Sequence, residues 1–230
     1  MLLLGIETAT DVCSVALVQG EKLLAELSVD VARSHASQLV PLVQRVLQDQ
    51  GKTPADLDVI AVSAGPGSYT GLRIGASTAK GLAFATGAAL VAVPTLEALA
   101  RAAMVGQPEA KPPILAVIPS RRGEVYAAVY IIASDGLTAV REPEAVKLTN
   151  LYDWLPDGHS LVIGPAAQTV LDAAPEPSQF LVVEAAPSAA HVATLGLERF
   201  KNGRTENVGA WEPYYLKGFV AKPPRPIFGA

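Results

Sequence analysis

The spacing of apolar residues follows the same order of strand-like and helical patterns twice along the chain. Residues 2–7, 14–18 and 22–31 are rich in aliphatic and β-branched side chains or alternate apolar with polar ones, which predicts three antiparallel strands. Helical and strand spacings then alternate as far as residue 104, and from residue 114 the same order begins again. We therefore expect two similar α/β lobes that face each other across a cleft.

The expected elements follow the order βββαβαβα in each half, although the halves share no sequence motif. In the first half we predict helices over 37–50, 69–86 and 95–104, and strands over 59–64 and 89–93. In the second half we predict strands over 114–118, 124–133, 137–146, 161–163 and 180–183, short helices near Leu151 and Gln168, and a helix over 188–201.

The polar, proline-rich stretch QPEAKPP (107–113) lies between the halves and predicts a division into lobes 1–108 and 109–230. Near the end of the sequence, WEPYYL (211–216) is apolar enough to pack on the fold. The following KPPRP (222–226) predicts an extended, mobile segment.

Charge and composition exclude several classes of protein. Half of the 230 residues are apolar, which is enough for a core, but only 17% are charged, so we expect part of the surface to be covered by a partner. The net charge of −4 provides no global positive field, which argues against autonomous binding of nucleic acid.

The single cysteine, Cys13, excludes an internal disulfide framework and fits a reducing compartment. The first strand reaches Glu7 too early for the apolar core of a signal peptide, and no stretch is long and apolar enough for a membrane helix. We therefore expect a cytoplasmic protein without a membrane segment.

The segment SAGPGSYTGLRIG (63–75) leads from a strand through a glycine-rich loop into a helix. It lacks the lysine of a Walker loop and the spacing of a dinucleotide fingerprint. Free N–H groups at a helix start attract anions, so the loop is either a candidate anion-binding site or a strand-to-helix turn without ligand. The residues of this candidate loop are Gly65, Gly67, Ser68 and Thr70.

Within the following helix, Gly71, Gly75 and Ala79 recur at intervals of four and leave one face almost bare. Glycine inside a helix costs about 0.5 to 1 kcal/mol relative to alanine, so the two glycines need a reason in packing. The bare face packs either on the protein's own sheet or against a partner helix, and both interpretations stay open.

Candidates for catalysis are weak. Ser63 lies in an approximate nucleophile elbow with His159 or His191 as possible bases, but the inserted Gly-Pro-Gly argues against a serine hydrolase. The histidines form no metal-binding pair on one helix face, so no metal site is predicted. Glu7 and the threonines that follow it form either a capped turn or a site that orients phosphate or water.

Several longer stretches carry a family resemblance: GIETATDVCSVAL (5–17), SHASQLVPLV (34–43), DLDVIAVSAGPGSYTGLRIGASTAKGLA (56–83), VPTLEALA (93–100), RRGEVYAAVY (121–130) and PYYLK (213–217). In them the sequence resembles the TsaB family of bacterial tRNA threonylcarbamoyladenosine biosynthesis proteins, also called YeaZ. The resemblance covers most of the first half, whereas Pro119-Ser120 stands where an Asp-Ala pair is usual. It implies two actin-like (RNase H-like) lobes, each with a mixed five-stranded sheet and flanking helices.

The resemblance also implies a non-catalytic role. Such proteins pair with the related subunit TsaD and, with the ATPase TsaE, help transfer threonylcarbamoyl to N6 of adenosine 37 in tRNAs that read codons beginning with A. The His-x-Glu-Gly-His metal motif of TsaD is absent here, so metal and acyl transfer are expected to belong to the partner. The resemblance further implies that the chain needs no cofactor, contacts tRNA only through the complex, and forms a homodimer when it is alone.

In the family the two helices of the first lobe form the pairing surface, which corresponds to 37–50 and 69–86. We expect Gly75→Leu to leave the chain folded and to break pairing. The competing function is an actin-like-fold ATPase or sugar kinase, which needs a carboxylate near a second phosphate loop, whereas residues 118–121 are Ile-Pro-Ser-Arg. The predicted contacts are His35, Leu39, Leu42, Val46, Gly71, Leu72, Gly75 and Ala79.

Overall fold

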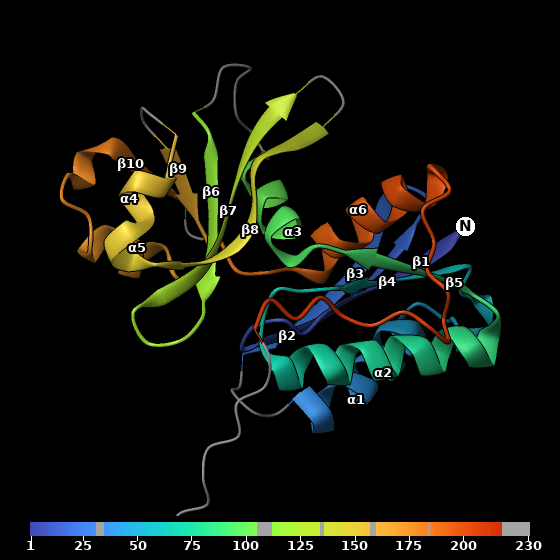
Figure 1. Cartoon of the computed structure of the whole chain (residues 1–230). Coiled ribbons are helices and arrows are strands. Elements are labelled where there is room, and N and C mark those ends of the chain that lie inside the picture. Colours follow the sequence, from blue (N-terminus) through green and yellow to red (C-terminus); the bar gives the residue numbers. More distant parts are fainter. Residues whose placement is uncertain (31–34, 105–111, 134–135, 157–159, 184, 218–230) are drawn as a thin grey trace, which may run out of the picture.

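The structure, a computed structural model, consists of two five-stranded mixed sheets with helices around them (Figure 1). The strand order is β3-β2-β1-β4-β5 in one sheet and β10-β9-β6-β7-β8 in the other. In each sheet the three strands that come first along the chain pair antiparallel, and the remaining two join in parallel. The predicted α/β fold with two similar lobes is confirmed. The structure describes residues 1–30, 35–104, 112–133, 136–156, 160–183 and 185–217.

The first sheet agrees with the sequence prediction to within a few residues at each strand end. Its central strands β1 and β4 are buried along their whole length, which explains why their sequences are continuously apolar except at the ends. The bounds are β1 Leu2–Glu7, β2 Val12–Gln19, β3 Lys22–Asp30, β4 Val59–Ser63 and β5 Ala89–Val93.

Two helices, α1 and α2, lie together beneath the first sheet in the view of Figure 1. The start and end of α2 follow from local chemistry: the Ser68 hydroxyl accepts a hydrogen bond from Gly71 N at 3.2 Å, and Gly87 takes the left-handed conformation at the end. The helices of this half are α1 His35–Asp49, α2 Tyr69–Thr86 and α3 Thr95–Arg101, with 3₁₀ turns at Pro54–Asp56 and Ala102–Met104.

The second half repeats the order of the first, as predicted. Its strands are β6 Ile114–Pro119, β7 Glu124–Ala133, β8 Gly136–Lys147, β9 Ser160–Ile163 and β10 Phe180–Val183. Its helices are α4 Leu151–Trp154, α5 Ala167–Asp172 and α6 Ala189–Lys201, with 3₁₀ turns at Leu148–Asn150 and Pro177–Gln179.

The last helix of the second half packs on the sheet of the first half. Val192 and Ala193 of α6 share a buried cluster with Leu3 of β1, and a Cβ at Gly196 would lie 2.3 Å from the Cβ of Ala61. The glycine therefore allows α6 to approach β4 closely.

Conversely, α3 from the first half packs on the second sheet, since Leu96 and Leu99 share a buried cluster with Ile118 of β6. Two ion pairs join the two helices, Arg199–Glu97 at 2.5 Å and Arg101–Glu198 at 3.1 Å. The helices α3 and α6 thus bind the lobes together (Figure 1). The predicted boundary between 108 and 109 falls in 105–111, outside the described residues, and stays a prediction.

After α6 the chain returns along the first lobe and crosses to the second. Lys80 of α2 donates to the carbonyl oxygen of Trp211 at 2.9 Å, and Tyr214 N donates to Ala64 O at 2.7 Å. Leu216 then packs against the core beside β6 and β7. The predicted packing of 211–216 is confirmed, whereas 222–226 lies outside the described residues.

None of the described helices is long and apolar enough to span a membrane. Within the same residues, no group of three or more His, Cys, Asp or Glu side chains could hold a metal ion.

Candidate functional site

The apolar stripe of α1 faces the protein's own core. Leu39 and Val46 are fully buried, and His35 is buried with Nε2 3.3 Å from the carbonyl oxygen of Val12. In this conformation these three side chains cover the sheet that α1 packs on, and their contact with a partner stays a prediction. Leu42 is half-buried and also packs against the core.

The bare face of α2 also packs internally. A Cβ at Gly71 would lie 2.1 Å from the carbonyl oxygen of Thr8, and one at Gly75 would lie 2.2 Å from Thr8 Oγ1. Leu72 and Ala79, the other two predicted contacts on α2, are fully buried. Thr8, directly after β1, thus occupies the face at Gly71 and Gly75, and the predicted contact of these four residues with a partner stays a prediction.

The opposite side of the helix pair is exposed and partly apolar. Phe84 is 86% exposed and Val40 is 48% exposed. Gly81 lies on the exposed side of α2, and a Cβ there would meet no atom of the residues that the structure describes. We call this surface the outer α1–α2 face and define it by Val40, Gln44, Ser77, Gly81 and Phe84. Sequence analysis did not identify this face. The available signal was Phe84, a large apolar residue that directly follows position 83, where the row of small residues on α2 continues.

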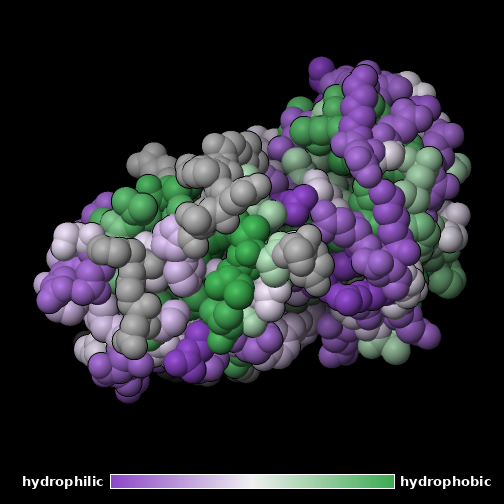
Figure 2. All heavy atoms as spheres, turned by 90° about the horizontal axis from the view of Figure 1, so that it is seen from above, coloured by the Kyte–Doolittle hydropathy of each residue, from purple (hydrophilic) through white to green (hydrophobic). Residues whose placement is uncertain are grey.

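Seen from above, apolar side chains also gather over the second lobe (Figure 2). The exposed large apolar residues of that lobe are Ile131, Ile132, Val140, Leu181 and Val182. Leu181, at 61%, is the most exposed of these and provides a natural comparison with Phe84.

The glycines of the loop before α2 are required by contacts within the chain. A Cβ at Gly65, which has a φ of 105°, would lie 2.4 Å from the carbonyl oxygen of Tyr214. A Cβ at Gly67 would lie 2.4 Å from the carbonyl oxygen of Ala9. The loop therefore holds the β1–β2 turn and the C-terminal stretch together, and its role in anion binding stays a prediction.

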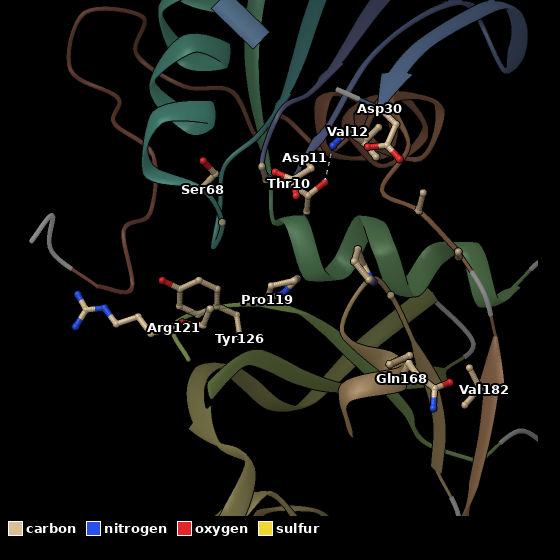
Figure 3. Close-up of a pocket in the computed structure, with 18 residues that line it drawn as sticks. Thr10, Asp11, Val12, Asp30, Ser68, Pro119, Arg121, Tyr126, Gln168 and Val182 are labelled. Atoms are coloured by element: carbon tan, nitrogen blue, oxygen red, sulfur yellow. Dashed lines mark hydrogen bonds between the residues drawn. The ribbon is translucent and has the colours of Figure 1, made fainter. Parts of the chain in front are cut away.

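A cavity of about 810 Å³ lies between the lobes, large enough for a small ligand or a short peptide. Gly67 and Ser68 of the predicted anion loop line it, whereas Gly65 and Thr70 do not. Figure 3 shows the side chains that surround it, with Thr10, Asp11, Asp30 and Ser68 from the first lobe and Pro119, Arg121, Tyr126, Gln168 and Val182 from the second. Sequence analysis had not singled out Asp11 or Asp30.

The polar residue at the end of β1, Glu7, is buried and does not line this cleft. Glu7 is fully buried, its Oε1 accepts a hydrogen bond from Ala9 N at 2.6 Å, and its Oε2 has no hydrogen-bond partner among the described residues. Burial raises the pKa of Glu7 to about 7. The hydrogen bond from Ala9 N agrees with the capped-turn interpretation of Glu7, and a role in orienting phosphate or water stays a prediction.

Ser63 is fully buried, and its hydroxyl accepts a hydrogen bond from Thr8 N at 3.3 Å. A nucleophile must reach its substrate, so this position argues against a serine hydrolase. His159 lies outside the described residues. Burial lowers the pKa of His191, the other base considered.

Comparison with known proteins identifies the family. The family model described as "TsaD: tRNA N6-adenosine threonylcarbamoyltransferase" matches residues 29–186. The TsaB protein of Escherichia coli (strain K12) is 32% identical over 226 residues, which cover 96% of each chain. A tRNA N6-adenosine threonylcarbamoyltransferase from Solidesulfovibrio magneticus is 38% identical over 127 residues, 49% of this chain and 34% of that protein.

The solved structure of YeaZ from Pseudomonas aeruginosa superposes with a TM-score of 0.83 at 26% identity, covering 94% of this chain and 99% of that one. The sequence match to TsaB and the structural match to YeaZ both extend over nearly the whole chain. This chain belongs to the TsaB (YeaZ) family of tRNA threonylcarbamoyladenosine biosynthesis proteins.

Proposed function

We propose that this protein is a non-catalytic scaffold subunit that pairs with a TsaD-like subunit through the outer α1–α2 face. The observation that carries the proposal is Phe84, an aromatic side chain that is 86% exposed one helical turn after the exposed Gly81. Exposed aromatic residues are typical anchors of protein interfaces. Glycine inside a helix costs about 1 kcal/mol relative to alanine, and no contact with the described residues offsets that cost at Gly81.

The sequence similarity between this chain and the TsaD family supports this mode of pairing. The TsaD family match begins before α1 and extends beyond α2, so a TsaD-like protein is expected to carry a similar helix pair. Two similar helix pairs can pack face to face around a pseudo-twofold axis, with Gly81 allowing a partner helix to approach. By the same argument, the chain forms a homodimer through this face when the partner is absent.

The remaining steps of the reaction belong to other subunits in this proposal. The TsaD-like subunit transfers threonylcarbamoyl to N6 of adenosine 37 in tRNAs that read codons beginning with A. The TsaE-like ATPase is recruited by the assembled pair. With a net charge of −4, this chain reaches tRNA only through the complex.

Replacing Phe84 with glutamate tests the pairing surface. We expect Phe84→Glu to weaken binding to the TsaD-like subunit by about 100-fold, because it places a charge at the centre of a desolvated contact. Leu181→Glu, at a similarly exposed apolar residue of the second lobe, is the matched control and is expected to bind normally. Size-exclusion chromatography with light scattering on the mixed subunits provides the measurement. Normal pairing by Phe84→Glu, or equal loss by both variants, would overturn the assignment of this face.

Calorimetry with ATP on the isolated chain separates this function from the alternative, an actin-like-fold ATPase or sugar kinase. A phosphoryl-transfer enzyme needs a carboxylate near the phosphates, and Asp11 lies in the cleft. Tight ATP binding by the isolated chain, together with absence of a heteromer, would favour the alternative. A heteromer without such binding supports the scaffold.

A further inference from the structure

Tyrosine rings and an arginine form a cluster at the start of α2. The ring centroids of Tyr69 and Tyr215 lie 4.9 Å apart, and the Arg73 guanidinium lies 5.6 Å from the centroid of the Tyr69 ring. Tyr214, the neighbour of Tyr215, is 56% exposed. A cation near an aromatic ring is attracted by the electron density of the ring face. The structure thus gathers aromatic side chains and a positive charge where the C-terminal stretch meets α2.

Further cations surround Glu124 at the start of β7. Lys217, two residues after Tyr215, forms an ion pair with the Glu124 carboxylate. Lys147 is paired in register with Glu124 across β7 and β8, and the Glu124 N–H donates to the carbonyl oxygen of Arg121 at 2.9 Å. The hydrogen bond from Lys217, together with the charges of Arg121 and Lys147, holds the pKa of the Glu124 carboxyl below its ordinary value. This carboxylate therefore lies among several cations.

The two clusters join into one surface that crosses from the first lobe to the second. Tyr215 and Lys217 are two residues apart, so the rings at α2 and the cations around Glu124 lie along one short stretch of chain. Arg121 points out of the cleft, on the side where Ser68 precedes α2 (Figure 3). We call this surface the cationic strip and define it by Arg73, Arg121, Lys147, Tyr214, Tyr215 and Lys217.

The cationic strip differs in charge from the chain as a whole. Its four cations outnumber the carboxylates of Glu124 and Glu212, which lie beside it, whereas the chain has a net charge of −4. Exposed aromatic rings next to cations are typical of surfaces that bind unpaired RNA, because bases stack on the rings and phosphates meet the cations. An acidic peptide would engage the cations but has no flat bases to stack on the tyrosines. The strip therefore fits RNA better than an acidic protein.

We infer that, in the complex with the TsaD-like subunit, the cationic strip contacts the single-stranded loop of tRNA that carries adenosine 37. Arg73 lies one helical turn before Ser77 of the outer α1–α2 face, and both are exposed, so an RNA held by the paired subunit can extend over the strip. The cations meet phosphates, and Tyr214 stacks on an unpaired base. This inference rests on the proposed function and adds to it a direct contact between this chain and RNA.

Fluorescence anisotropy with a labelled anticodon stem-loop measures RNA binding by the mixed subunits. Arg121→Gln/Lys147→Gln is expected to weaken binding at least ~5-fold and to reduce the slope of log affinity against log salt concentration by about 1 to 2, because two phosphate contacts are lost. The matched control Lys22→Gln/Arg204→Gln removes the same charges at exposed residues, and Lys22 lies at the opposite end of β3 from the cleft. This control is expected to bind RNA as the wild type does.

Tyr214 distinguishes RNA from an acidic peptide as the occupant of the strip. Tyr214→Ala is expected to weaken binding of the stem-loop at least ~5-fold, whereas Tyr214→Phe keeps the ring and is expected to bind as the wild type. Equal binding by Tyr214→Ala and the wild type would overturn the inference. Displacement of the RNA by a polyglutamate peptide at equal concentration would do the same, because charge alone would then explain the strip.

Light scattering on the same mixtures separates a failure of pairing from a failure of RNA binding. Absence of a heteromer in the wild type would contradict the proposed function. The variants are then compared on the isolated chain at low salt, where electrostatic contacts are stronger, and the same order of affinities is expected. Normal RNA binding by Arg121→Gln/Lys147→Gln, an equal loss in the control, or no RNA binding by either form of the wild type would overturn the inference.

Discussion

Gly71→Ala is expected to lower the free energy of unfolding of the isolated chain by about 2 to 3 kcal/mol, because overpacking forces the backbone to shift. The added methyl group would lie 2.1 Å from the carbonyl oxygen of Thr8, which belongs to the backbone and cannot rotate away. Gly81→Ala, on the same helix, is expected to raise the unfolding free energy by about 0.5 to 1 kcal/mol, since alanine favours the helix and its methyl group meets no atom in the described part of the chain.

Urea denaturation of the two variants gives a matched comparison within α2. Equal effects would contradict the conclusion that one face of α2 packs inside the fold and the other lies on the surface.

The contact with Thr8 also revises the expectation for Gly75→Leu. A side chain there would strike Thr8, so this variant is expected to lose the fold as well as pairing, and a defect in pairing would say nothing about the interface.

The second large effect is a dependence of stability on pH that originates at Glu7. Burial raises the pKa of this carboxyl from 4.5 to about 7, so the folded state binds more protons than the unfolded state between these values. The part of the folding stability that depends on Glu7 is therefore fully present at low pH and is lost as the pH rises through about 7. Between pH 5 and pH 8 the contribution of Glu7 to the free energy of unfolding falls by about 2 to 3 kcal/mol.

Glu7→Gln isolates this contribution, because glutamine has no proton to lose. We expect the difference in unfolding free energy between the wild type and Glu7→Gln to change by about 2 to 3 kcal/mol in favour of the variant from pH 5 to pH 8. Glu21→Gln, at a side chain that is 83% exposed, is the control and is expected to show a small change. A difference for Glu7→Gln that stays constant with pH would contradict the buried, protonated carboxyl.

The order of elements follows from short-range patterns. Apolar spacing in windows of ten to twenty residues predicted the strands and helices of both halves, and local chemistry explains individual ends such as Ser68 and Gly87 of α2. The exchange of α3 and α6 between the sheets could not be predicted in this way. Periodicity shows that a helix has an apolar face, but it does not show which sheet covers that face.

The cleft and the pairing surface depend on contacts between residues far apart in the chain. The sequence by itself determined the α/β class, the two lobes, the family and the bare face of α2. Only the tertiary structure decided that Thr8 occupies this face, leaving Gly81 and Phe84 exposed on the other side. The physical reason is that a row of small residues allows close approach by any backbone, and only the folded chain shows that its own residue Thr8, and not a partner, lies against that row.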